Sequence, residues 1–175
     1  MHTYEQLEKE RLARGERGDC CVKALAVARQ IPYEKALTIT SQYGRPYRRG
    51  MYTAQVIRML RGECGSERLD GHELDRLRQS IGVKNLTPNN VVKALRKCGY
   101  GSWRFVALTN NHAIGIDRCE VIDWAEGRKH HITHLFPVRP EPKPEAVKLQ
   151  RKMRHKKARR LGVDPKTGLP MVWAA

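Results

Sequence analysis

The stretch RGDCCVKALAVARQIPYEKA (residues 17–36) decides how the first half of this chain folds. Asp19 is a favourable N-capping residue, and the apolar run behind it predicts a helix from Asp19 to about Arg29. Pro32 then restarts the chain as a second helix, which we expect to continue to about Tyr43. Because two adjacent cysteines open the first helix, the stretch also raises the question of whether one of them is a nucleophile.

The two cysteines differ in the side of the helix on which they fall. At about 100° per residue, one side is polar and the other apolar. The polar side holds Lys23, Arg29 and Gln30, and the apolar side is centred on Cys21, Leu25 and Ala28. Cys21 is therefore predicted to be core, whereas Cys20 lies at the edge of the core, where N–H groups and the helix dipole stabilise a thiolate or an oxyanion. The alternative is that both cysteines only pack as small apolar residues.

A candidate base and a candidate orienting acid occur together in HAIGIDRCEVID (residues 112–123). The DR dipeptide in its middle predicts a two-residue hairpin turn, with Ile116 facing Cys119. In that register His112 faces Asp123 on one side of the sheet, where a hydrogen bond would leave the other imidazole nitrogen free as a base. The alternatives are an ordinary surface His–Asp pair, or a slip of one residue that sends the two side chains to opposite faces.

The rest of the chain predicts helices first and strands second, which defines an α+β domain. Residues 1–17 form a polar helix or arm, residues 52–62 a third helix closed by Gly62, and residues 67–82 a charged segment that is helical or irregular. Residues 86–101 form a helix in which Thr87 caps, Pro88 occupies the first turn and Gly99 ends the helix. Four short apolar blocks then predict a small antiparallel β-meander: 103–108, 112–117, 119–124 and 132–138.

Three regions follow from composition: an arm at 1–17, a domain at 18–138, and a linker with a basic tail at 139–175. The tail has eleven Lys and Arg residues against three acidic residues, and the whole chain has a net charge of +16. This surplus predicts an anionic partner, either nucleic acid or an acidic nucleoprotein such as a virion assembly, although basic tails also aid solubility. The expected contact residues are Lys148, Arg151, Lys152, Arg154, Lys156, Lys157, Arg159 and Arg160.

Other classes of protein receive less support. The charged N-terminus lacks the apolar region of a signal peptide, and no apolar run is long enough to span a membrane, so we expect a cytoplasmic protein with no membrane partner. Five cysteines, with no C-x-x-C pair, favour reduced thiols over disulfides or structural zinc. His130 and His134 share one face of a predicted strand but have no obvious third ligand, so we expect no metal and no other cofactor.

The motifs GDCCVKALAVARQIPYEKAL, YGRPYRRGMYTAQVIRML and NHAIGIDRCEVIDW together resemble the small papain-like cysteine hydrolases of bacteria and their phages, which are similar to peptidases of the bacteriocin-leader type. The resemblance covers roughly residues 18–125 in the same order. It implies a papain-like fold, a peptide or amide substrate, Cys20 as the nucleophile, His112 as the base and Asp123 as the orienting acid. It also implies that the protein works in a bacterial cytoplasm or in a virion.

One position departs from this family. Papain-like enzymes usually place an oxyanion-hole Gln or Asn several residues before the cysteine, whereas RLARGERG (residues 11–18) offers only arginines and a glutamate. Two hypotheses follow. Either the protein is a cysteine peptidase or amide hydrolase in which an arginine replaces that amide, or it is an inactive papain-like fold that acts as a nucleic-acid-binding or virion-associated protein.

Overall fold

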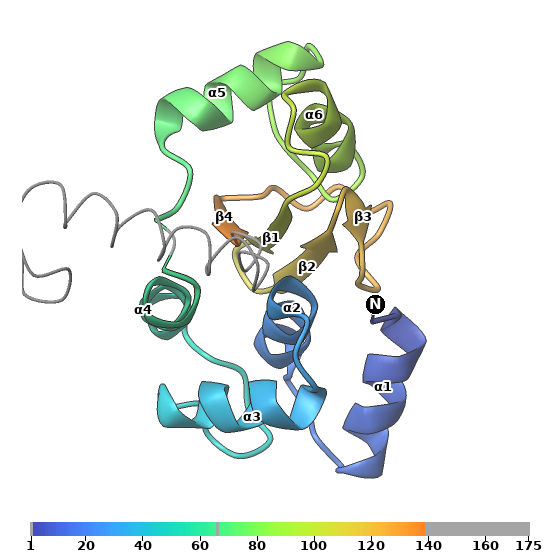
Figure 1. Ribbon diagram of the computed structural model, residues 1–175, viewed down its shortest axis with the longest axis vertical. Helices are drawn as coiled ribbons and strands as arrows, with labels where there is room; N and C mark the ends of the chain where they lie inside the picture. The colour runs from blue at the N-terminus through green and yellow to red at the C-terminus, as the bar shows by residue number, and fades with distance from the viewer. Residues whose placement is uncertain (1, 66, 139–175) are drawn as a thin grey trace, which may run out of the picture. The chain divides into compact units, whose positions relative to one another are not determined.

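The computed structural model describes residues 2–65 and 67–138, and within them it confirms the α+β class (Figure 1). The predicted linker and basic tail, with all eight proposed contact residues, lie outside the described residues. The helices are α1 (Tyr4–Ala13), α2 (Cys20–Arg29), α3 (Tyr33–Gln42), α4 (Thr53–Cys64), α5 (Gly71–Ser80) and α6 (Val91–Lys97). The strands are β1 (Arg104–Leu108), β2 (Ala113–Asp117), β3 (Glu120–Val121) and β4 (His134–Val138).

Both faces of the sheet are covered by helices, which explains why its strands are apolar on both sides. Val106 and Leu108 of β1 belong to the same buried cluster as α2, whereas Phe105 and Ala107 belong to the cluster formed with α5 and α6. Figure 1 shows α2 against one side of the sheet and the α5–α6 pair at the other end of the molecule. Successive strand residues point to opposite faces, so each strand contributes to both cores. The result is a helix–sheet–helix arrangement.

The sheet is antiparallel, as predicted, but its strand order is β3-β2-β1-β4 and not that of a meander. β4 pairs with β1, from Arg104 opposite Val138 to Leu108 opposite His134. The long connection after β3 therefore crosses to the far edge of the sheet, as in the 4-1-2-3 order of a Greek key. The prediction was wrong here because sequence blocks alone do not say which neighbour a strand pairs with.

The hairpin between β2 and β3 uses a different turn from the predicted one. Ile116 pairs with Val121 and not with Cys119, and the two turn residues are Arg118 and Cys119. Both adopt left-handed backbone conformations, with φ of 45° and 64°, as the tight two-residue turns of hairpins require. Asp117 stays in the strand, where its carboxylate accepts a 2.8 Å hydrogen bond from Arg104 Nε across the β1–β2 pair.

The predicted helices are present, with changes at their ends. α2 and α3 agree with the prediction within a residue. α4 continues past Gly62 and ends before Gly65, and the charged segment contains α5. α6 begins only at Val91, so Thr87 and Pro88 belong to the turn that precedes the helix. There, the backbone N–H of Thr87 donates to the side chain of Asn90, so Thr87 does not cap α6.

Lys23 does not face solvent as the helical pattern predicted, because α1 covers it. Its side chain is buried, forms an ion pair with Glu8 of α1, and lies 3.6 Å from Asp19 Oδ1. Asp19 occupies the N-cap position of α2, but its side chain does not cap the helix. Instead, Asp19 Oδ2 accepts a hydrogen bond of 2.8 Å from Tyr33 Oη. Burial of Leu7 completes the contact, so α1 is docked onto the domain at the start of α2.

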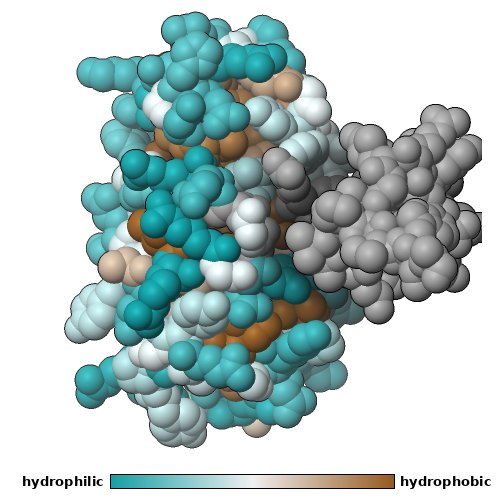
Figure 2. Space-filling model, turned by 60° about the vertical axis from the view of Figure 1, so that its left-hand side comes forward, coloured by the Kyte–Doolittle hydropathy of each residue, from teal (hydrophilic) through white to brown (hydrophobic). Residues whose placement is uncertain are grey.

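The face of the molecule shown in Figure 2 is mostly hydrophilic, with apolar side chains visible in separate small patches. Leu12, Tyr47, Tyr52 and Trp124 are the large apolar or aromatic side chains that are most exposed in the part of the chain that the structure describes. In that same part, no helix has both the length and the apolar character needed to cross a membrane.

Candidate active site

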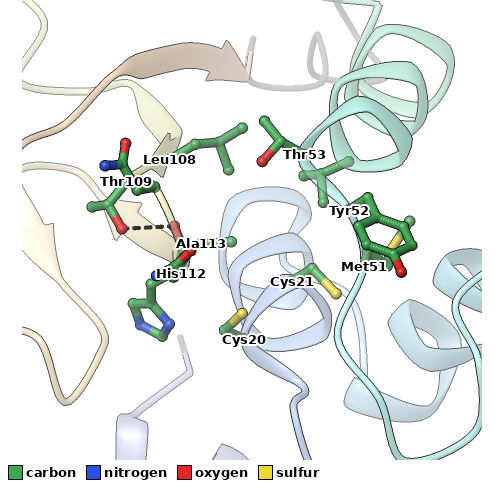
Figure 3. Close-up of a pocket in the computed structure, with 12 residues that line it drawn as sticks. Cys20, Cys21, Met51, Tyr52, Thr53, Leu108, Thr109, His112 and Ala113 are labelled. Carbon is green, nitrogen blue, oxygen red and sulfur yellow. Dashed lines mark hydrogen bonds between the residues drawn. The ribbon is translucent and has the colours of Figure 1, made fainter.

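Cys20 is the first residue of α2, and the packing of that helix on the sheet carries it to His112. Gly115 of β2 allows the close approach, because a Cβ at this position would lie 2.7 Å from the Cβ of Val27. Cys20 is partly exposed and Cys21 is buried, as the helical pattern predicted. In Figure 3 the side chain of Cys20 lies beside the His112 ring, whereas the sulfur of Cys21 points toward Met51 and Tyr52.

His112 is held at the end of the β1–β2 hairpin, directly before β2. Leu108 and Ala113 form the last strand pair, and the four residues between them turn the chain. The backbone N–H of Thr109 donates to the carbonyl oxygen of His112 at 2.9 Å, and the Thr109 hydroxyl donates to the same oxygen at 3.3 Å (Figure 3). These bonds fix the backbone of His112 and so direct its side chain toward the start of α2.

Asp123 holds the far side of the His112 ring. Nε2 of His112 lies 2.8 Å from Oδ1 of Asp123, and the carboxylate is buried. The same oxygen accepts the backbone N–H of Ala125 at 2.8 Å, so the turn after β3 keeps the carboxylate in place. A proton on Nε2 is therefore favoured, which leaves Nδ1 for the sulfur of Cys20. Although the predicted hairpin register was wrong, the structure brings His112 and Asp123 together.

The environment of the pair favours a thiolate facing an imidazolium. Burial by itself raises the pKa of the Cys20 thiol, but hydrogen bonds from His112 and from the backbone N–H of Ala113 bring it below the ordinary value. Burial by itself lowers the pKa of His112, but hydrogen bonds to Asp123 and to Cys20 raise it to about 9. Each charged form therefore stabilises the other.

Cys21 has the opposite electrostatic character, although it is the adjacent residue. Burial raises the pKa of its thiol to about 12, with a further increase from the neighbouring charge of Cys20. Cys21 is thus a neutral thiol near pH 7. The two cysteines of the motif are therefore chemically distinct, because only Cys20 lies within reach of a base.

A cleft extends along both sides of His112. On one side a cavity of about 230 Å³ is lined by Cys20, Cys21, Met51, Tyr52, Thr53, Val56, Leu108 and Ala113. On the other side a hollow of about 410 Å³ is lined by Trp124, His130 and His131. Residues 109–112 line both spaces. The candidate nucleophile therefore opens onto the first of these two spaces, and the turn at residues 109–112 borders both, so together they form the candidate substrate cleft.

The segment before Cys20 provides a buried ion pair and no amide side chain. Glu16 and Arg45 are both buried, and Arg45 Nη2 donates to Glu16 Oε2 at 2.8 Å and to the carbonyl oxygen of Arg17 at 3.0 Å. The upstream arginines Arg11 and Arg14 form ion pairs with Glu8 and Glu34. This bonding engages Arg11 and Arg14 elsewhere, and the start of α2 offers backbone N–H groups as oxyanion donors beside Cys20.

The sequence reasoning did not single out three cleft residues, Trp124, Asn110 and Asn111. The Trp124 ring lies over His112, with ring centroids 5.0 Å apart, and so covers the His112–Asp123 bond from one side. Asn110 and Asn111 place two amide side chains on the turn that carries His112. Their positions directly beside His112 and Asp123 in the sequence were the available signal, since residues next to a catalytic side chain usually line its cleft.

The two histidines considered as metal ligands do not share a strand face. β4 begins at His134, whose ring stacks on Phe136, whereas His130 lies in the preceding loop against Trp124. Residues 2–65 and 67–138 contain no group of three or more His, Cys, Asp or Glu side chains placed to hold a metal ion.

Comparison of the chain with protein-family models, with curated proteins and with solved structures found no match.

Proposed function

We propose that this protein is a papain-like cysteine hydrolase that cleaves a peptide or amide bond. The observation that carries the proposal is the grouping of Cys20, His112 and Asp123: His112 Nε2 lies 2.8 Å from Asp123 Oδ1, and His112 and Cys20 line the same cavity. A nucleophile at a helix N-terminus, packed against an antiparallel sheet that carries its base, also supports the papain-like assignment. The expectation that the source is bacterial or phage stays part of this proposal.

The first half of the reaction forms an acyl-enzyme. The Cys20 thiolate attacks the carbonyl carbon, a C–S bond forms, and the carbonyl electron pair moves to the oxygen. N–H groups at the start of α2 stabilise that oxyanion. The intermediate then collapses, the C–N bond breaks, and the His112 imidazolium gives its proton to the leaving amine. The product is a Cys20 thioester and a free amine.

The second half releases the acid. Neutral His112 takes a proton from water, the resulting hydroxide adds to the thioester carbonyl, and the C–S bond breaks to restore the thiolate–imidazolium pair. Asp123 remains charged throughout and holds Nε2–H, so that Nδ1 always faces the sulfur and the substrate. In this mechanism His112 is the group that gives and takes the proton in both halves of the reaction.

The decisive experiment compares the rate at which a neutral electrophile, iodoacetamide, alkylates each cysteine near neutral pH, with intact-mass and peptide mapping. We expect Cys20 to react fastest, His112→Ala to remove that advantage, and Cys20→Ala to abolish hydrolysis of a casein or peptide-library substrate. Cys98 is a matched comparator, because it is free and partly exposed and its sulfur lies 4.0 Å from the carbonyl oxygen of Arg76. Equal rates at Cys20 and Cys98 would favour the inactive binding protein instead.

We further propose, from charge alone, that residues 139–175 bind nucleic acid or an acidic nucleoprotein such as a virion assembly. The chain has a net charge of +16, and its last segment is strongly basic. Phosphate contacts release counterions, so binding of a fluorescent duplex DNA should weaken steeply as salt is added. Replacing the eight Lys and Arg residues between 148 and 160 with Gln, in the full chain, should remove most of that salt dependence. Unchanged binding would place the nucleic-acid contact elsewhere.

A further inference from the structure

Among the described residues, the lining of the cleft carries no charge apart from the reacting pair and the histidines. On one side of His112 its surface is mostly apolar, formed by Cys21, Met51, Val56, Leu108 and Ala113. Amides, hydroxyls, the Trp124 ring and imidazoles line the rest of the cleft. Since burying an unpaired charge is costly, the centre of the cleft favours a residue with a small uncharged side chain.

The first rim of the cleft is reached through Met51 and Tyr52, which line the cavity and end the loop at residues 44–52. It packs on the segment before the nucleophile, where a Cβ on Gly18 would lie 2.8 Å from the backbone nitrogen of Gly50. Its exposed side chains are aromatic and cationic: Tyr47 and Tyr52 are 71% and 81% exposed, and the Arg48 guanidinium lies 5.2 Å from the centre of the Tyr47 ring. No Asp or Glu occurs between residues 35 and 62, so no nearby carboxylate in the sequence offsets these cations.

The second rim, formed by residues 124–131, repeats this combination on the other side of His112. Trp124 is 48% exposed, and the Arg128 guanidinium lies 5.9 Å from the centre of its ring. Lys129 follows, and Glu126 is the only acidic residue between 124 and 138. Each rim therefore offers an exposed aromatic ring with a cation over it, and the uncharged cleft lies between them.

We infer that the natural substrate is a polypeptide segment with acidic residues on both sides of a short uncharged stretch, which contains the bond to be cleaved. The inference rests on the proposed hydrolase function and adds the class of substrate to it. Carboxylates of the substrate would meet Arg48 and Arg49 on one rim and Arg128 and Lys129 on the other, and the aromatic rings would contact the intervening chain. The uncharged lining then excludes a charged residue from the reacting position.

Aromatic rings with cations also suit single-stranded nucleic acid. A polypeptide is favoured because the rims flank a thiol and an imidazole, whose chemistry is attack on a carbonyl, and because the lining is largely apolar. Binding of nucleic acid at the rims is accordingly one of the outcomes that the experiment below distinguishes.

The test uses the full chain and three pools of internally quenched peptides that share a randomised centre of Ala, Ser, Val and Leu. The flanks on both sides are Asp-Glu, Asn-Gln or Lys-Arg. At low salt we expect kcat/KM for the acidic pool to exceed that for the neutral pool about tenfold, because attraction between opposite charges raises association rates. The ratio should fall as salt rises to about 0.3 M, where exposed charges are screened.

Charge-reversed variants locate the effect. Arg48→Glu with Arg49→Glu should abolish the preference for acidic flanks. Arg76→Glu with Lys84→Glu changes the net charge equally, at exposed positions in and after α5, and should keep the preference. Melting temperature and Cys20 alkylation show that each variant is folded and has an intact reacting pair.

The outcomes separate this inference from the function on which it rests. Equal cleavage of the acidic and neutral pools would overturn the substrate inference and leave the hydrolase standing. Absence of all cleavage with rapid Cys20 alkylation would also overturn it. Absence of all cleavage, with Cys20 no more reactive than Cys98, would overturn the hydrolase itself. If a single-stranded oligothymidine loses affinity for the Arg48→Glu, Arg49→Glu variant and no acidic preference exists, the rims bind nucleic acid instead.

Discussion

Nε2 of His112 and Oδ1 of Asp123 lie 2.8 Å apart, and His112 lines the same cavity as Cys20. This bond does two things for the proposed reaction: it orients the ring, and it raises the pKa of His112, together with the hydrogen bond to Cys20, to about 9 against the effect of burial. Because Asp123 Oδ1 is also bonded to the N–H of Ala125, the carboxylate is placed before any substrate binds.

Substituting Asp123 should therefore affect both rate and pH profile. Asp123→Ala removes orientation and charge, and we expect kcat to fall about 100-fold. Asp123→Asn keeps an oxygen that can accept Nε2–H, so its loss should be smaller, on the order of tenfold. In both variants the alkaline limb of the kcat/KM profile should move below pH 9, since the carboxylate no longer stabilises the imidazolium. An unmoved alkaline limb would show that Asp123 does not control the charge of His112.

Alkylation of Cys20 should follow the pKa values of the pair. Because the pKa of Cys20 is lowered, its thiolate persists below the pH at which an ordinary thiol is protonated. At about pH 6 we expect iodoacetamide to modify Cys20 at least tenfold faster than Cys98, a difference that should narrow as the pH rises toward 9 and ordinary thiols ionise. His112→Ala should shift the pH profile of Cys20 alkylation upward, because the hydrogen bond from His112 is lost. A single shared profile for both thiols would contradict an activated Cys20.

Glu8→Gln should destabilise the docking of α1. Hydrogen bonds from Arg11 and Lys23, opposed by burial, lower the pKa of Glu8 from 4.5 to about 2. We expect the free energy of unfolding at pH 7 to fall by about 1–3 kcal/mol, because a bond to buried Lys23 is lost. A lowered pKa stabilises the fold above pH 4.5, and that contribution disappears as the pH falls through about 2, so wild type and variant should converge in acid.

Glu67→Gln is the control for this measurement. Glu67 pairs with Arg61 at 3.1 Å, and both side chains are more than half exposed, so its substitution should change the free energy of unfolding by less than about 1 kcal/mol. Equal effects of the Glu8 and Glu67 substitutions would mean that the ion pair between Glu8 and buried Lys23 adds nothing to the free energy of unfolding beyond what an exposed pair adds.

Gly115→Ala should weaken the contact between α2 and the sheet. The added Cβ would lie 2.7 Å from the Cβ of Val27 and 2.9 Å from its Cγ1, so the helix must move away from β2. We expect a loss of about 1–3 kcal/mol in chemical denaturation and a slower alkylation of Cys20, because α2 carries the thiol. Gly71→Ala meets nothing within 4 Å and should stay within about 0.5 kcal/mol of wild type. Similar stability of both variants would contradict this packing.

Several features of the fold were predictable because they depend on residues close together in the chain. Helical periodicity separated Cys20 from Cys21, since both lie on one rigid element whose apolar side must face the core. The same reasoning failed for Lys23, because the pattern of one helix does not reveal that another helix, α1, covers its polar side with Glu8.

The pairing of His112 with Asp123 was predicted correctly, although the turn from which it was predicted was wrong. The predicted turn was off by one residue, so the pairing of β2 with β3 shifted by two, and an even shift leaves each side chain on its original side of the sheet. The turn itself depends on contacts with β1: Asp117 lies in the strand, bonded to Arg104 of β1, and Arg118 and Cys119 make the turn.

By itself, the sequence determined the succession of helices and strands and the partly exposed thiol at the start of α2. It also determined that His112 and Asp123 could meet on one hairpin. Tertiary structure decided that β4 returns beside β1, that α1 covers Lys23, and that Met51 and Tyr52 line one cavity beside His112 while Trp124 lines another. The physical reason is range: periodicity and turn chemistry act over a few residues, whereas strand order and cleft walls depend on contacts between distant segments that compete for the same buried surface.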